Sequence, residues 1–206
     1  VEGWDQDKLE TAFTNLVQDV IGPDARRLGF ESTSEEIASD KLLRPKVVRA
    51  SAFLGHNKTF RKKANEIVAA YFEAPKKVDV ERLELALEIA ARDGDEKLWQ
   101  QIRDGISEAP SPSKRVALIG ALGRFDDPEL VEKSLAAYFS EDIRSQDTWT
   151  LVGPTLREEA TAAVTWTWFT ENFDKVVDKV GKRVAGRLTW FGSAFCSEER
   201  KTEVAE

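Results

Sequence analysis

Three residue types are missing or nearly missing from this chain: it has no methionine, one cysteine (Cys196) and one histidine (His56). A lone cysteine cannot form a disulfide within the chain, which favours a reducing compartment, and we predict the cytoplasm. A lone histidine excludes a zinc site built on two imidazoles, including the H-E-x-x-H motif of metalloproteases. We therefore predict no catalytic residue, no metal ligand and no bound cofactor in this chain by itself.

Other absences exclude further kinds of active site and of binding partner. The sequence has no G-x-S-x-G elbow, no G-x-x-x-x-G-K-[ST] phosphate loop and no Cys/His cluster. No apolar run reaches the 18 residues or so of a membrane-spanning helix, so we expect no membrane partner. The net charge of −7 argues against nucleic acid, because phosphate contacts need a basic face. Because the chain starts at Val1 without an initiator, we expect a piece of a longer protein.

Apolar residues make up 41% of the 206 residues and charged residues 33%, which indicates a globular protein with a well-solvated surface. We predict one domain over residues 1–206. The apolar residues recur at helical spacing, without sustained β alternation, so we predict an all-α protein. In the first predicted helix, capped by Asp5 or Asp7, one face carries Leu9, Phe13, Leu16, Val17 and Val20.

The predicted helices are separated by Gly, Pro and acidic turns. They span residues 6–20, 41–54, 58–73, 79–92, 95–107, 113–123, 127–139, 157–171 and 172–185, with one more from 197 onwards. Gly22-Pro23 predicts a short turn that runs to Glu31.

A loosely repeated unit of helix, acidic turn and helix organises the second half of the chain. Asp95 and Asp127 are 32 positions apart, as are Leu98 and Leu130, whereas Leu130 and Val176 are 46 apart. A repeat of this length built from helix pairs is typical of an α-solenoid, so we predict an α-α superhelix of antiparallel helix pairs of HEAT or armadillo type.

Residues 140–157 interrupt this rhythm, because they are polar and irregular and contain Gly153-Pro154. We predict a long loop there, and long loops in helical stacks often carry function. Arg144, Gln146 and Asp147, with Trp149 after them, could line a peptide-binding wall. Alternatively, Asp147 caps the next helix and pairs with Arg144, and we leave both interpretations open. The other tryptophans on helix stripes, Trp99, Trp166 and Trp168, are predicted to be packing residues.

The same segment carries a family resemblance. Ile143-Arg144-Ser145-Gln146-Asp147 is followed, 19 positions after Asp147, by a Trp-rich run, residues 166–173 (WTWFTENF). This order resembles the C-terminal helical domain of zinc aminopeptidases related to aminopeptidase N, including the endoplasmic-reticulum and puromycin-sensitive enzymes. There, a "QD" pair precedes a W-x-F/W-x-x-x-N-W-like signature.

Further landmarks in the same order extend the resemblance over nearly the whole chain. They are Leu28-Gly29-Phe30-Glu31, Leu43-Arg44, and Arg92-Asp93-Gly94-Asp95 followed by Trp99. Phe30 and Phe173 stand where the family often has tryptophan, which is a conservative departure.

The resemblance implies a bowl of helix pairs that closes over a thermolysin-like catalytic domain and encloses the peptide-substrate cavity. It also implies that the zinc and the catalytic residues belong to domains upstream of Val1. On this motif match, Arg144, Gln146 and Asp147 become candidates for binding the peptide substrate. The parent protein would be a zinc metallo-aminopeptidase, in which this chain is non-catalytic and associates with the upstream catalytic domain.

Two other functions fit the same sequence. A freestanding helical-repeat scaffold would bind a protein partner along its concave face. A small-molecule-binding helical domain is a third possibility. An H-E-x-x-H motif followed by a distal glutamate in the preceding part of the reading frame would favour the aminopeptidase over both.

Overall fold

The computed structural model describes residues 5–34 and 36–195. These residues form twelve α-helices and two 3₁₀ segments, and no strand occurs among them, so the all-α prediction is confirmed. The chain divides into two compact units, Val1–Ala90 and Ala91–Glu206, which are described separately below. The helix-pair superhelix and the single domain over residues 1–206 stay predictions.

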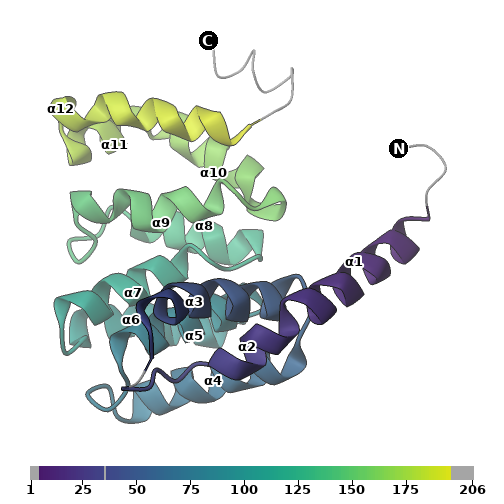
Figure 1. Cartoon of the computed structure of the whole chain (residues 1–206). Helices are drawn as coiled ribbons and strands as arrows, with labels where there is room; N and C mark the ends of the chain where they lie inside the picture. The colour runs from purple at the N-terminus through teal and green to yellow at the C-terminus, as the bar shows by residue number, and fades with distance from the viewer. Residues whose placement is uncertain (1–4, 35, 196–206) are drawn as a thin grey trace. The chain divides into compact units, whose positions relative to one another are not determined.

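The first unit consists of five helices (Figure 1). They are α1 (Gln6–Val20), α2 (Gly22–Leu28), α3 (Ala38–Phe53), α4 (Lys58–Glu73) and α5 (Val80–Arg92), whose last two residues fall in the second unit. Asp5 caps α1 by accepting the Lys8 amide at 3.3 Å, and Asn57 caps α4. Val48, Ala64 and Leu83, one residue from each of three helices, are completely buried in its core.

The turn predicted after Gly22-Pro23 was wrong, because residues 22–28 form helix α2. Pro23 lies in the first turn of that helix, where its missing N–H removes no hydrogen bond. Ala25 and Leu28 are buried, and their burial stabilises a helix too short to be stable alone. Gly29 ends α2 with a φ of 53°, a left-handed conformation that suits glycine.

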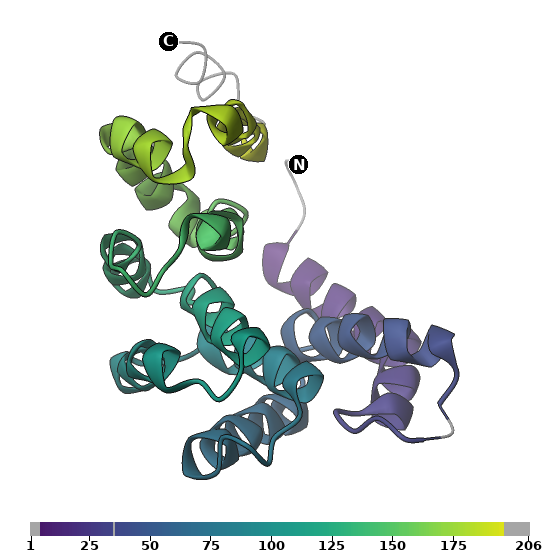
Figure 2. The same ribbon diagram turned by 90° about the vertical axis from the view of Figure 1, so that its left-hand side faces the viewer.

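The second unit is built from successive helices and short turns (Figure 2). They are α6 (Glu96–Glu108), α7 (Pro112–Leu122), α8 (Pro128–Ala137), η1 (Ser145–Asp147), α9 (Thr148–Thr155), α10 (Glu159–Glu171), α11 (Phe173–Val180), α12 (Lys182–Ala185) and η2 (Gly186–Ala194). Helix α6 packs against α7, α7 against α9, and α8 against α10. The helix predicted from residue 197 onwards lies outside the described residues.

The two aspartates that mark the repeat perform the same task. Asp95 caps α6 by accepting the Leu98 amide at 2.9 Å, and Asp127 caps α8 by accepting the Glu129 amide at 2.9 Å. A capping carboxylate satisfies one of the free N–H groups at a helix start, which explains why both repeats keep an acidic turn.

The long loop predicted over residues 140–157 was wrong in its second half, where α9 runs through Gly153 and Pro154. Leu151 and Val152 are completely buried, and this burial outweighs the poor helix propensity of the glycine and proline. A close approach adds to it, since a Cβ on Gly123, at the end of α7, would lie 2.2 Å from the Leu151 carbonyl oxygen. Only glycine allows α9 to pack this closely.

The predicted packing tryptophans lie in the core of the second unit. Trp99 is 9% exposed and donates its indole N–H to the Ser134 hydroxyl at 2.8 Å, and Trp166 is 5% exposed. Trp168 is half-buried and packs edge-on against Tyr138, with ring centroids 5.5 Å apart.

Candidate functional site

The three predicted site residues lie together in η1, the 3₁₀ turn between α8 and α9, or directly before it. Arg144 and Gln146 are exposed, whereas Asp147 is only 2% exposed. The structure therefore separates the trio into two side chains that can contact a ligand and one that is buried beneath them.

Asp147 is buried as half of an ion pair. Its carboxylate accepts a hydrogen bond from the Arg115 guanidinium on α7 at 2.6 Å and another from the Arg144 backbone N–H at 2.9 Å. The Arg115 side chain is itself only 14% exposed. Asp147 thus closes the η1 turn, and it pairs with Arg144 through the backbone rather than through the guanidinium. The structural interpretation was thus only partly right: the Asp147 side chain makes no cap hydrogen bond to α9 and its ion-pair partner is Arg115, which leaves the Arg144 guanidinium available.

A second ion pair holds the segment that leads into η1. The Arg103 guanidinium donates to both Asp142 carboxylate oxygens, at 2.5 and 3.1 Å, and the Ser140 hydroxyl donates to the same carboxylate at 2.6 Å. Burial alone would raise the pKa of Asp142, but the hydrogen bonds from Ser140 and Arg103 outweigh it and hold the pKa below its usual value.

A lysine from α11 fixes the start of this segment, just after α8. The Lys179 ammonium donates to the Tyr138 carbonyl at 2.6 Å and to the Ser140 carbonyl at 3.3 Å, and it lies 4.7 Å from the Tyr138 ring centroid. A cation at this position satisfies the free carbonyl groups of a helix end. Burial lowers the pKa of Lys179.

Arg144 and Gln146 line a groove of about 440 Å³, which we call the η1 groove. Arg115, Asp142 and Glu141 also line it, together with the turn at 109–112 that joins α6 to α7. Arg115 and Asp142 are committed to the ion pairs described above. Arg144 has no carboxylate partner within the described residues, so its charge is available to a ligand.

Trp149 does not belong to the η1 groove, contrary to the peptide-wall interpretation. It lines a separate groove of about 400 Å³ with Arg157 and Trp190, and its ring packs on Phe191 at a centroid distance of 4.8 Å. The local sequence could not reveal this, because the partner ring comes from η2, some 40 positions later.

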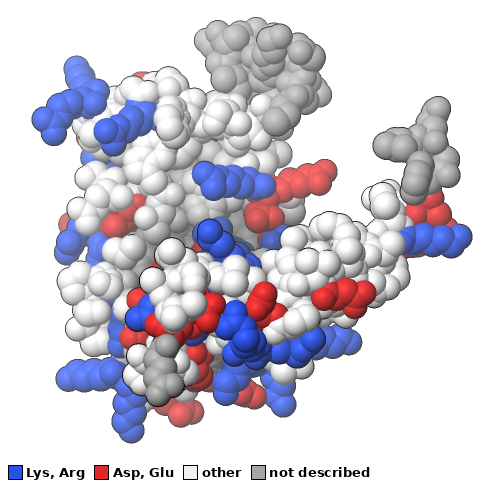
Figure 3. Space-filling view, in the orientation of Figure 1, with Lys and Arg blue, Asp and Glu red and all other residues white. Residues whose placement is uncertain are grey.

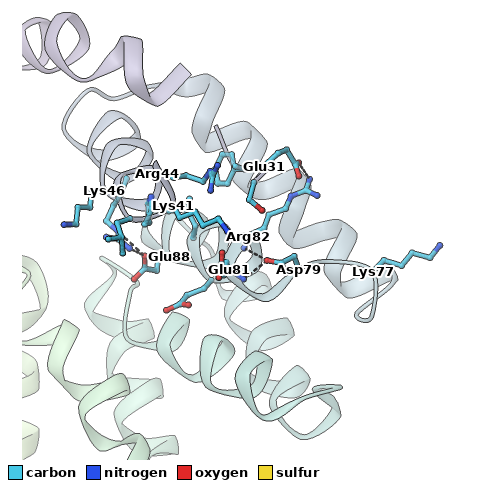
Figure 4. A pocket seen from close by; sticks show the side chains of 16 residues that line it. Glu31, Lys41, Arg44, Lys46, Lys77, Asp79, Glu81, Arg82 and Glu88 are labelled. Carbon is cyan, nitrogen blue, oxygen red and sulfur yellow. Dashed lines mark hydrogen bonds and ion pairs between the residues drawn. The ribbon is translucent and has the colours of Figure 1, made fainter. Parts of the chain in front are cut away.

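A larger groove than these two lies in the first unit, between α3 and α5, and has a volume of about 640 Å³ (Figure 4). We call it the α3–α5 groove. Six basic and five acidic side chains line it. Its three arginines are all ion-paired: Arg44 with Glu36, Arg49 with Glu88, and Arg82 with Glu31. Figure 4 shows that Lys46 and Lys77 point away from its centre.

No group of three or more His, Cys, Asp or Glu side chains within the described ranges is arranged to hold a metal ion. No helix in those ranges is both long enough and apolar enough to cross a membrane.

The comparison with known families decides what kind of domain this is. The model of the ERAP1-like C-terminal domain matches residues 2–206. The chain belongs to the ERAP1-like C-terminal domain family. This confirms the resemblance to the helical domain of the aminopeptidase N group.

Individual relatives agree with this assignment. Aminopeptidase 2 of Candida albicans is 24% identical over 98% of this chain, and aminopeptidase M1-A of Oryza sativa is 28% identical over 91% of it. Aminopeptidase N of Lactococcus lactis is 27% identical over 84% of the chain. The chain spans about a fifth of the length of these relatives, 21–22% in each case. It is thus homologous to the C-terminal part of aminopeptidases.

Proposed function

We propose that this domain encloses the peptide-substrate cavity of a zinc-dependent aminopeptidase and restricts access to its active site. The active site would be carried by a catalytic domain outside the 206 residues. The family membership supports the link to an aminopeptidase, because the relatives bear that name and match through their C-terminal parts.

The observation that carries the role in substrate binding is the η1 groove. Arg144 and Gln146 are exposed at its edge, while Asp147 and Arg115 form a buried pair that fixes the turn. A guanidinium offers several donors to a carboxylate, and an amide can both donate to and accept from a peptide backbone. Arg144 and Gln146 would therefore bind the carboxyl-side part of a peptide, and Asp147 would position them.

Zinc, in this proposal, belongs to the absent catalytic domain. The described residues do not offer a ligand set for it, so no chemical step is assigned to this chain. The domain would instead contribute through its shape and charge, by admitting and orienting the peptide.

The compartment and the excluded partners stay predictions. The single cysteine is the argument for the cytoplasm. One relative, from Saccharomyces cerevisiae, is instead named a mitochondrial aminopeptidase. The net charge of −7 is the argument against nucleic acid.

Arg144→Ala in the full-length parent enzyme tests the proposal. Removing the guanidinium should raise KM for peptides of eight or so residues about tenfold, the equivalent of ~1.4 kcal/mol, because a charged hydrogen bond to the peptide tail is lost. KM for an aminoacyl-arylamide, which is too short to reach the groove, should change less than about twofold. Steady-state kinetics with both substrates gives the two values.

The matched control is Arg183→Ala, which removes an exposed arginine on α12 that lines none of the three grooves. It should leave both KM values unchanged. An equal rise of KM for both substrates in Arg144→Ala would remove Arg144 from the site. A parent protein without aminopeptidase activity would favour the freestanding scaffold.

A further inference from the structure

Helix α1 exposes an apolar stripe that no other described element of the first unit covers. Its four members are each about half to two-thirds exposed: Leu9 53%, Phe13 47%, Leu16 58% and Val20 67%. Figure 1 shows that α1 extends beyond the other helices of the first unit. In Figure 3 most of its visible surface is neither acidic nor basic.

The helix is held to its unit only at the C-terminal end. Val17 is the one buried residue of α1, and Gln18 donates its side-chain amide to the Gly55 carbonyl at 2.7 Å. The first two turns, from Gln6 to Phe13, are exposed throughout. An isolated helix of this length is marginal in water, so a neighbouring surface must stabilise it.

The spacing of the stripe defines the shape of that surface. Leu9, Phe13, Leu16 and Val20 are separated by four, three and four positions, which is the alternation of d and a positions in a heptad. Such a seam packs against a single neighbouring helix at a small crossing angle, with side chains fitting into holes of the facing helix. A sheet face or a membrane surface would match a wider apolar face.

The charges of α1 and its cap argue against a second copy of this chain as the partner. Residues 5–20 contain four acidic side chains (Asp5, Asp7, Glu10 and Asp19) and one basic side chain (Lys8), a net charge of −3. Two copies would place these like charges side by side along the seam, which is destabilising. A partner helix with lysine and arginine beside its apolar residues would instead be attracted.

We propose that the Leu9–Phe13–Leu16–Val20 stripe binds one amphipathic helix with basic flanks, supplied by the part of the parent protein outside the matched region. This inference rests on the proposed function, because it requires a longer parent. The relatives carry nearly four-fifths of their length outside the matched region, 78% in the Candida albicans protein, so ample chain is available to provide the helix. The stripe is therefore an internal packing surface of the parent.

Hydrogen exchange measured by mass spectrometry tests the proposal. The backbone amides of residues 9–20 should exchange at least about tenfold more slowly in the full-length parent than in the 206-residue chain. In the parent, the double variant Phe13→Ser/Leu16→Ser should abolish this protection. The control Thr11→Ser/Asn15→Ser, on exposed positions outside the stripe, should retain it.

The basic flanks are tested by Glu10→Lys/Asp19→Lys in the parent, which should lower the protection at least about threefold, and more at low salt. Equal exchange of α1 in the parent and in the chain would overturn the docking site. Dimerisation of the 206-residue chain in sedimentation, lost in Phe13→Ser, would overturn the choice of occupant. Unchanged protection in Glu10→Lys/Asp19→Lys would overturn the basic flanks.

The kinetic experiment with Arg144→Ala reports on the η1 groove and not on α1. If the amides of α1 are not protected in the parent, but Arg144→Ala raises KM for long peptides more than for aminoacyl-arylamides, only the helix docking is refuted. If the amides of α1 are protected, but Arg144→Ala changes KM for both substrates equally, only the substrate contact is refuted.

Discussion

The α3–α5 groove and the η1 groove are lined by the same kinds of charged residue, but they use them differently. In the larger α3–α5 groove, Arg49 and Arg82 pair with carboxylates that also line it and remain 39% and 29% exposed, whereas the Arg44–Glu36 pair is buried, at 8% and 4% exposure. In the η1 groove, the Arg115–Asp147 pair is buried beneath the surface, at 14% and 2% exposure. Arg144 is left outside it.

This difference teaches that volume is a poor guide to a binding site. A groove whose arginines are already paired with carboxylates has less electrostatic attraction left for a ligand, whatever its size. A smaller groove with a fixed turn and one unpaired arginine is better prepared, because its geometry is set before the ligand arrives.

The largest effect is expected from Asp147→Ala. Its loss leaves the Arg115 guanidinium buried without a partner and removes the acceptor for the Arg144 N–H, which should lower the free energy of unfolding by about 3–5 kcal/mol. Urea denaturation of the 206-residue chain, followed by circular dichroism, gives the value.

Two further variants distinguish two causes of lost stability, an unpaired buried charge and a missing helix cap. Asp127→Ala removes an exposed capping carboxylate on α8 and should cost only about 1 kcal/mol. Asp147→Leu/Arg115→Met replaces the pair by apolar groups and should recover most of the lost stability. If Asp147→Ala lowers the free energy of unfolding no more than Asp127→Ala does, the Arg115–Asp147 pair does not stabilise the η1 groove.

The helices of this fold are largely predictable from sequence, because most are amphipathic and begin at capping residues. Asp95 and Asp127 place the starts of α6 and α8 to within one residue, and the apolar stripe over residues 79–92 does the same for α5. The single helix predicted over residues 172–185 was wrong, because Gly181, with a φ of 83°, separates α11 from α12. Two other errors, α2 and α9, share one cause. Each is short and contains glycine and proline, so its stability comes from tertiary burial that local propensity does not report.

The candidate site is only half predictable. The family motif identifies Arg144, Gln146 and Asp147, but it does not tell which of them is buried. That distinction depends on Arg115, 32 positions earlier on α7. Contacts between residues so far apart leave no periodic signal in one sequence. The same limit explains why Trp149 was grouped with Arg144 although it packs on Phe191.

An intermediate effect is expected from Asp142→Asn, at the edge of the η1 groove. Loss of the charged hydrogen bonds from Arg103 and Ser140 should lower the free energy of unfolding by about 1–2 kcal/mol near pH 7. Because the pKa of Asp142 is lowered by folding, its contribution is fully present above the ordinary value of 3.8 and declines as pH falls through the lowered pKa.

The gap between wild type and Asp142→Asn should therefore be constant from pH 7 to about pH 5 and shrink below the ordinary value of 3.8. Urea unfolding at pH 7, 5 and 3.5 measures it. A gap that widens toward acid would contradict the ion pair, since it would mean that the protonated carboxyl is the favoured form.

The smallest effect is expected from Glu31→Gln, which breaks the exposed pair with Arg82 in the α3–α5 groove. Glu31 is 62% exposed, and water and ions screen such a pair, so the free energy of unfolding should fall by only about 0.2–1 kcal/mol. The difference should vanish in 1 M NaCl, where the screening length is about 3 Å. Guanidinium chloride would mask this dependence, so urea is the denaturant of choice.

A loss above about 2 kcal/mol, unaffected by salt, would show that the pairs of the α3–α5 groove are as structural as the buried pair of the η1 groove. The contrast between the two grooves would then lie in position alone, and pairing could no longer support the proposal that the η1 groove is the binding site.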